Sequence, residues 1–163
     1  MNENPPSKYS LLSRLAAVRT QRMLKEKALF EQIAVELRHA LVGFLGAPAD
    51  AITFRVLSEN CDFAEPREFN DADPHLRRGR DNKWYFAICL HLQTDESPAY
   101  GKARFKFAAQ PGDAGQQIVE LDRKWTVKAG DLNSYESLVS YIYSDLESDC
   151  KKPPEAVTKR IGF

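Results

Sequence analysis

The stretch from Trp84 to Leu92 constrains the fold more than any other part of this sequence. It reads Trp-Tyr-Phe-Ala-Ile-Cys-Leu-His-Leu and contains no Pro, no Gly and no Lys, Arg, Asp or Glu. A period of two residues divides it into Trp84, Phe86, Ile88, Leu90 and Leu92 on one side and Tyr85, Ala87, Cys89 and His91 on the other. Because aromatic and β-branched residues favour strands, the pattern predicts a central strand with one face toward a hydrophobic core.

The size and charge of the chain bound its organisation. With 163 residues it is long enough for one domain with a substantial core and short for two. We therefore expect a single α+β domain over residues 1–163, with residues 1–7 and 153–163 as tails. The 23 basic and 23 acidic residues balance, so binding to nucleic acid or to an anionic membrane would need a local patch.

Composition also bears on location. The longest apolar run has nine residues, far below the roughly 20 that a membrane-spanning helix needs. The first residues are polar and contain two prolines, and they lack the apolar segment of a secretory signal. Three widely spaced cysteines, an odd number, fit a reducing compartment better than a disulfide framework. We therefore expect a cytoplasmic protein without a membrane-spanning segment.

A long helical region is predicted from about Lys8 to Phe44, where helix-forming residues dominate and no Pro or Gly occurs before Gly43. Apolar residues of its second half recur at steps of three and four and predict a face that packs on the sheet: Phe30, Ile33, Ala34, Leu37, Leu41, Phe44 and Leu45. The first half has a weaker face and many cations, and it could form a separate helix with a break near Thr20 or Gln21.

Further strands are predicted on both sides of the central one. They are Ala51–Leu57, Gly101–Ala108 and Gln116–Lys128, the last as one strand or as a pair broken near Asp122. Residues 58–83 form a mostly polar stretch that is long for a connection inside a domain. We expect a long loop there, which either contains a short element around Phe63–Phe69 or serves as a binding loop.

The chain then turns into a last predicted helix. Asn133 followed by Glu136 resembles a capping box, and Pro153 and Pro154 forbid continuation much past Cys150. The order of elements is α-β-β-β-β-α. Because each strand and each helix has one apolar side, we expect an antiparallel four-stranded meander sheet with the N-terminal helical region and the C-terminal helix packed on one face.

Charges are segregated within the long loop. Acidic residues come first, and the cations Arg77, Arg78, Arg80 and Lys83 follow. Three arginines around a glycine could grip phosphate or carboxylate groups through paired hydrogen bonds, so Arg77, Arg78 and Arg80 are candidate binding residues. A solvated loop whose two halves pair with each other explains the pattern about as well.

Opposite charges also separate between the two ends of the chain. Residues 7–27 hold six cations and one anion, a net charge of +5, and Arg14, Arg19 and Arg22 lie among them. Residues 129–149 hold five acidic residues and no Lys or Arg, a net charge of −5. The two regions could neutralise one another within the fold or across a dimer, or the basic region could bind phosphates or an acidic partner protein.

The water-facing side of the predicted sheet is a third candidate surface. It carries one tyrosine and several cations: Arg55, Tyr85, His91, Lys102, Arg104, Lys106 and Lys124. Such a face could bind and stack RNA, with Arg104 among its contacts. Alternatively, Glu120 and Asp122 on the next strand pair with Arg104 and Lys106, as charges on a wet sheet face usually do.

Short motifs for phosphate loops, dinucleotide binding, nucleophile elbows, zinc proteases and Cys-x-x-Cys pairs do not occur in the sequence. Asp71, Asp73 and His75 stand at alternate positions after Cys61, but this spacing does not define the three or four ligands that a metal needs. We therefore expect no catalytic residue, no metal site and no cofactor.

Individual histidines and cysteines give no stronger indication. His39 on the predicted helix and His91 on the central strand are expected to be packed or surface side chains, because no nucleophile is paired with them. Cys89 is flanked by apolar residues and is expected to act as a small hydrophobe.

These observations favour a non-catalytic interaction module that binds a protein partner or associates with itself. The alternative is a nucleic-acid-binding protein that uses the basic N-terminal helix, with Arg14, Arg19 and Arg22, together with the loop of Arg77, Arg78 and Arg80.

Overall fold

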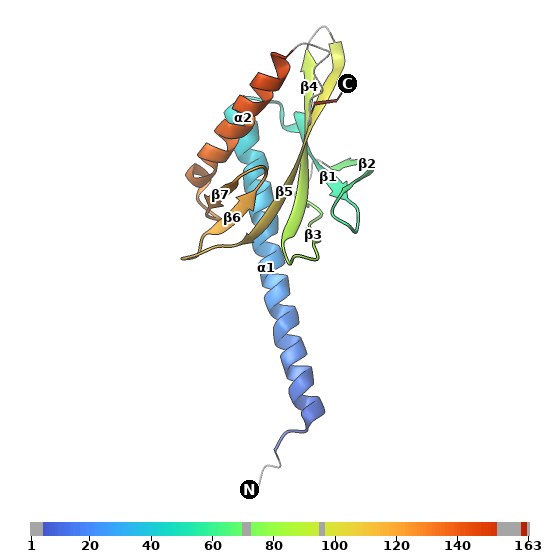
Figure 1. The fold of residues 1–163 in the computed structure, drawn as a ribbon, viewed down its shortest axis with the longest axis vertical. Helices are drawn as coiled ribbons and strands as arrows, with labels where there is room; N and C mark the ends of the chain where they lie inside the picture. The colour runs from blue at the N-terminus through green and yellow to red at the C-terminus, as the bar shows by residue number, and fades with distance from the viewer. Residues whose placement is uncertain (1–4, 70–72, 95–96, 153–160, 163) are drawn as a thin grey trace.

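The computed structural model describes residues 5–69, 73–94, 97–152 and 161–162. Two α-helices and a mixed set of long and short strands make up this part of the chain (Figure 1). The elements follow in the order α1 (Lys8–Leu45), η1 (Ala49–Ala51), β1 (Ile52–Leu57), β2 (Phe63–Phe69), β3 (Arg77–Arg78), β4 (Trp84–Thr94), β5 (Ser97–Pro111), β6 (Gln117–Glu120), β7 (Lys124–Val127), η2 (Leu132–Tyr135), α2 (Glu136–Cys150) and β8 (Ile161–Gly162).

The N-terminal region is one continuous helix, so the alternative of two helices with a break near Thr20 or Gln21 is wrong. The side chain of Ser7 accepts a hydrogen bond from the Ser10 N–H at 3.1 Å and caps the start of α1. Gly46 follows the last helical residue with a φ of 59°, a left-handed conformation that glycine adopts without a Cβ clash. The weaker apolar face of the first half therefore reflects a change of surroundings along one helix.

The α+β class is confirmed, with a long N-terminal helix, an antiparallel sheet and a C-terminal helix. The strand order is β2-β1-β4-β5-β6-β7, with β3 also paired to β4 and β8 to β5, so the sheet has more strands than the four expected. The stretch 58–83, expected as a long loop, contains β2 and β3, and β2 occupies the short element allowed at Phe63–Phe69. It forms because β1 has an edge that β4 leaves open, and β2 pairs with that edge.

One prediction for the C-terminal half is confirmed and another is wrong in part. Gln116–Lys128 forms the pair β6 and β7, the second of the two arrangements allowed. Within the expected tail 153–163, residues 161–162 pair with β5 as β8, and residues 153–160 and 163 lie outside the described part, as do residues 1–4 of the other tail.

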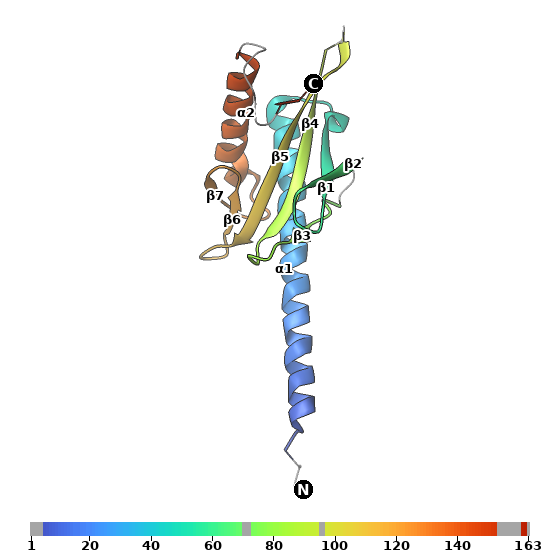
Figure 2. The ribbon, with the colours of Figure 1, turned by 45° about the vertical axis from the view of Figure 1, so that its right-hand side comes forward.

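One face of the sheet carries the core. The register places Phe86 opposite Phe107 and Ile88 opposite Phe105, so the apolar sides of β4 and β5 point the same way. Both helices cover this face, as the turned view shows (Figure 2). Fully burying one such side chain stabilises the fold by about 1.5–3 kcal/mol. The members of the core from the central strands and the helices are Phe30, Ile33, Leu37, Leu41, Trp84, Phe86, Ile88, Phe105, Phe107, Leu138, Val139 and Ile142.

Glu36 fastens the start of the C-terminal helix to α1. Its carboxylate accepts hydrogen bonds from the hydroxyl of Tyr135 at 2.7 Å and from the Gly130 N–H at 2.9 Å. Burial, and then the hydrogen bond to this carboxylate, raise the pKa of Tyr135, so the hydroxyl keeps its proton. Asp131 caps the short helix η2, where its side chain accepts a hydrogen bond from the Asn133 N–H. The helix α2 begins at Glu136 with Tyr135 at its N-cap position and without a side-chain cap, so the capping box predicted at Asn133 is wrong.

Candidate functional site

The first half of α1 extends beyond the rest of the molecule (Figure 1). Every residue from Leu11 to Lys25 is exposed, including Leu12 at 65% and Leu24 at 58%, whereas Phe30 in the same helix is 0% exposed. We call Lys8–Lys25 the projecting segment. At about 1.5 Å per residue it is about 27 Å long. Its exposed large apolar side chains are Tyr9, Leu11, Leu12, Leu15, Val18, Met23 and Leu24.

Three of the exposed apolar side chains of the projecting segment, Tyr9, Leu12 and Met23, continue the buried face of α1. Steps of four and three residues, which stay on one side of a helix, lead back from Phe30 through Glu26, Met23, Arg19, Ala16, Leu12 and Tyr9. The face that packs on the sheet therefore continues into solvent, interrupted by Glu26 and Arg19. A helix face of this kind is what a second protein surface would cover.

Glu26 lies where α1 leaves the domain. Its carboxylate accepts a hydrogen bond from the indole N–H of Trp84 at 2.8 Å and lies 3.6 Å from Nη1 of Arg78. The guanidinium of Arg78 lies 5.2 Å from the ring centroid of Trp84. The arginine loop is thus held against the base of the projecting segment.

The structure brings together only part of the predicted binding set. Arg14, Arg19 and Arg22 are exposed on the projecting segment, and the loop of Arg77–Arg80 lies at its base through the contact of Arg78 with Glu26. Arg104 belongs to a different surface: it lies on the open face of the sheet, with its guanidinium 5.7 Å from the ring centroid of Phe63.

Within the loop, the three arginines have different surroundings. Arg77 donates from Nε to the carbonyl oxygen of Leu57 at 3.3 Å. Arg78 and Arg80 line a hollow of about 360 Å³, to which Lys106 adds a third cation and Glu59 and Asp81 add carboxylates. The hollow therefore carries both charges. The ion pairs of Arg78 and Lys83 go to Glu26 and Glu120, outside the loop.

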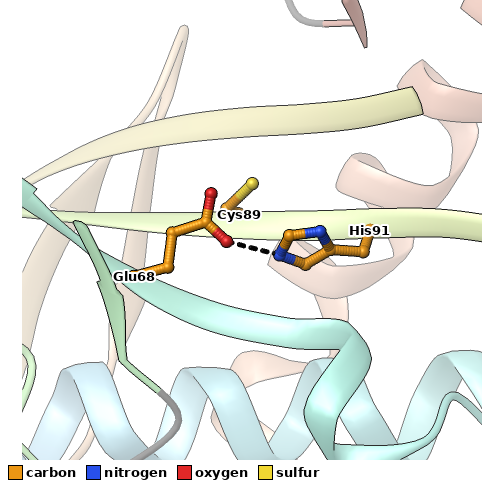
Figure 3. Close-up of side chains that lie close together, drawn as sticks. All are labelled: Glu68, Cys89 and His91. Carbon is orange, nitrogen blue, oxygen red and sulfur yellow. Dashed lines mark ion pairs between the residues drawn. The ribbon is translucent and has the colours of Figure 1, made fainter. Parts of the chain in front are cut away.

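A second site lies on the open face of the sheet, near the edge that β2 forms. The carboxylate of Glu68 on β2, the thiol of Cys89 and the imidazole of His91, both on β4, lie within 4.8 Å of one another (Figure 3). We call these residues the Glu68 cluster. Nε2 of His91 is 2.6 Å from Oε2 of Glu68. Pairing in the sheet brings them together, because Glu68 lies opposite Arg55 on β1 and Cys89 lies opposite Thr53 on the same strand.

Cations surround the carboxylate of the Glu68 cluster. Lys102 Nζ lies 3.1 Å from Oε1 of Glu68, and Arg55 Nη1 lies 3.5 Å from the same oxygen. Burial, the largest influence, would raise the pKa of Glu68, but the hydrogen bond from Lys102 and the charges of His91 and Lys102 together lower it. Glu68 is therefore held as a carboxylate.

The thiol of the cluster is protonated when nothing is bound to it. Burial, and then the negative charge of Glu68, raise the pKa of Cys89 to about 11, against smaller opposing effects of Lys102 and Arg55. A nucleophilic cysteine needs the opposite shift. The arrangement resembles a set of oxygen, nitrogen and sulfur ligands more than a catalytic cysteine site.

Sequence reasoning missed the Glu68 cluster. It assigned Glu68 to a loop, so no neighbour on β4 could be inferred for it. The only sequence signal was the alternate spacing of Cys89 and His91, which places both on one face of a strand. The other arrangement considered does not form among the described residues: Cys61 is not close enough to Asp73 and His75 to share an ion, and Asp71 lies outside the described part.

None of the helices in the described part of the chain combines the length and the apolar composition needed to span a bilayer. No protein-family model, curated protein or solved structure matches this sequence.

Proposed function

We propose that this chain is a non-catalytic, cytoplasmic interaction module that binds protein through the projecting segment, and that its partner is a second copy of the same chain. The observation that carries the proposal is the exposure of every residue from Leu11 to Lys25 on a helix whose buried face continues through them. The three free cysteines support the cytoplasmic location.

The energetics of a lone helix support a protein partner. Most helical stability in proteins comes from packing of an apolar face. The projecting segment instead exposes seven large apolar side chains along about 27 Å of helix. A contiguous exposed apolar surface of this kind is typical of protein interaction sites.

Charge complementarity supports a second copy as the occupant. Two projecting segments side by side would each contribute basic residues and would repel. The region around α2 carries the opposite charge, through Glu136 and also Glu147, which pairs with Lys151 at 3.0 Å. It exposes Phe44 and Tyr143, whose ring centroids are 6.0 Å apart. A reciprocal dimer in which each projecting segment lies along the other copy's α2 would cover apolar side chains and pair opposite charges at once.

The oligomeric state of the full chain tests this proposal. Size-exclusion chromatography with light scattering should give twice the 18.5 kDa of one chain at micromolar concentration. The double variant Leu12→Glu/Leu15→Glu should be a monomer, because it places two carboxylates on the apolar face. Ala17→Glu, on the opposite face of the same segment, is the matched control and should still dimerise.

A charge exchange tests the identity of the partner surface. Arg14→Glu/Arg19→Glu and Glu136→Lys/Glu147→Lys should each weaken self-association, and an equimolar mixture of the two variants should restore it, because opposite charges then meet at both contacts. A wild-type chain that remains a monomer at all concentrations would refute the second copy as partner. A mixture no stronger than either variant alone would refute α2 as the surface.

Nucleic-acid binding is the alternative function. The contact of Arg78 with Glu26 favours this alternative, because the contact holds the arginine loop beside the basic helix. Against it, the cations of the projecting segment alternate with leucines and valine, which would be left exposed on a phosphate backbone. Filter binding with a random duplex and a single strand, titrated with salt, decides: binding that falls steeply with salt and is lost in Arg77→Ala/Arg80→Ala supports the alternative.

A further inference from the structure

We propose that Glu68, Cys89 and His91 bind a zinc ion on the open face of the sheet. The three side chains supply one carboxylate oxygen, one thiolate sulfur and one imidazole nitrogen, which are the three kinds of ligand that zinc takes from proteins. The site is separate from the projecting segment, so it stands independently of the proposed self-association.

The positions of the ligand atoms suit a tetrahedral ion after small side-chain movements. Zinc bonds of about 2.0–2.3 Å place tetrahedral ligand atoms about 3.3–3.8 Å apart. The three ligand atoms lie within 4.8 Å of one another, and the closest measured pair, Nε2 of His91 and Oε2 of Glu68, is 2.6 Å apart. Binding opens this pair by about 1 Å as the ion takes its place between nitrogen and oxygen. Three protein ligands leave the fourth position to water.

The backbone fixes the ligands before any ion binds. Cys89 and His91 are two residues apart on β4, in a continuous run of paired residues with β5 from Trp84 to Leu92. Glu68 is placed by its pairing with Arg55 on β1. Ligands on rigid strands lose little conformational entropy on binding, which favours a built site over a chance cluster on loops.

The ligand set selects the class of ion. A thiolate and an imidazole favour zinc over magnesium and calcium, which prefer sets made of oxygen atoms. Cys89 is 0% exposed, and its sulfur lies within 4.8 Å of the ligand atoms of Glu68 and His91. Thr53 completes the surroundings: its Oγ1 lies 3.3 Å from Oε2 of Glu68 and 3.3 Å from Nε2 of His91, where it can keep the carboxylate oriented.

Arg55 and Lys102 compete with the zinc ion for the carboxylate of Glu68, but they do not prevent zinc from binding. Zinc brings two positive charges and displaces the thiol proton of Cys89 together with, when His91 is charged, its Nε2 proton. The net charge beside Arg55 and Lys102 therefore rises by at most one. Lys102 is the easier competitor to displace, because its side chain is about half exposed while that of Arg55 is buried.

Thermal unfolding of the full chain with and without zinc tests the proposal. At a free zinc concentration about 100 times the dissociation constant, the unfolding midpoint should rise by about 5–10 °C. A chelator should reverse the rise, and magnesium at the same concentration should give none. His91→Gln and Cys89→Ala should abolish the rise, while His39→Gln and Cys150→Ala, at exposed positions, should keep it.

Two further measurements identify the site even if Cys89→Ala does not fold. Calorimetric titration in buffers of different ionisation enthalpy should show the release of one to two protons per zinc, because the thiol loses its proton. Cobalt(II) should give a thiolate charge-transfer band that is present in Cys150→Ala and His39→Gln and lost in His91→Gln.

Lys102→Met provides a variant that strengthens rather than removes binding. Without the competing ammonium, the zinc affinity should rise several-fold. An absence of any zinc-dependent rise in the wild type, or a rise that persists in His91→Gln, would refute the site, and a zinc affinity unchanged in Lys102→Met would refute Glu68 as a ligand.

Discussion

The two halves of α1 have the same secondary structure and opposite surroundings. From Phe30 to Leu41 the helix buries its apolar residues against the sheet and α2, while from Leu11 to Lys25 every residue is exposed. Both halves are rich in residues with high helix propensity, and no Pro or Gly occurs between Lys8 and Val42. The difference shows that one continuous helix can be stabilised in two ways. Burial of apolar side chains stabilises its second half, and helix propensity stabilises its exposed first half.

The largest expected difference between the halves comes from removing one apolar side chain in each. Phe30→Ala should lower the free energy of unfolding by about 3–5 kcal/mol, because Phe30 is fully buried and its loss leaves a cavity. Leu12→Ala should change the stability of the monomer by less than about 0.5 kcal/mol. Urea denaturation, at a protein concentration low enough to keep the chain monomeric, measures the free energy of unfolding of both variants. Equal losses in the two variants would contradict the difference between the two halves of α1.

Arginines give a second contrast. Arg38 in the buried half donates from Nε to the carbonyl oxygen of Ile52 at 2.7 Å and from Nη2 to that of Ala49 at 2.5 Å. Arg38→Met should cost about 1.5–3 kcal/mol, since it leaves the carbonyl groups of Ala49 in η1 and Ile52 in β1 without their charged donor. Arg22→Met in the projecting segment should leave the chemical denaturation midpoint unchanged.

The boundary between the halves can be tested at Glu26. Glu26→Ala removes the acceptor of the Trp84 indole N–H and the partner of Arg78, and it should cost about 1–2 kcal/mol because a mostly buried donor is left unsatisfied. Tryptophan fluorescence and urea denaturation follow the effect. Lys25→Ala, at the neighbouring exposed residue, is the control, and an equal cost there would place the boundary elsewhere.

The smallest effect on stability is expected from deleting the projecting segment, although this change removes the most residues. Removing residues 1–24 should change the free energy of unfolding of the monomer by less than about 0.5 kcal/mol, because no residue from Leu11 to Met23 packs on the domain. The same deletion should abolish self-association. A loss of several kcal/mol would show that the projecting segment folds back on the domain in solution.

Much of this fold can be predicted from the sequence, because periodicity records which side of an element is buried. The alternation around Trp84 and the three- and four-residue steps from Phe30 to Leu41 assign core faces that the structure confirms. Phe44, predicted on the same helix face, is exposed. Periodicity failed for β2, where the polar composition of residues 58–83 indicated a loop. A strand on the edge of a wet sheet face can be stabilised by pairs such as Arg55 with Glu68, which a single segment does not reveal.

The candidate sites were predictable to different degrees. The basic projecting segment was visible in the sequence as a cluster of Arg14, Arg19 and Arg22. Its exposure depends on where β4 ends, at Trp84, which contacts Glu26 on α1. No local sequence pattern contains this long-range contact. The Glu68 cluster requires the pairing of β2 with β1 and of β1 with β4. Long-range pairing of this kind brings together side chains that are far apart in the sequence, and residue spacing alone cannot supply it.

The continuity of α1 has a mechanical consequence. The helix has no proline or glycine between Lys8 and Val42, and its second half is buried in the core. Packing of the second half therefore fixes the direction of the first half relative to the sheet. A partner that bound near Tyr9 would therefore have a fixed distance and orientation relative to the open face of the sheet. The monomer would determine the geometry of such a complex before binding.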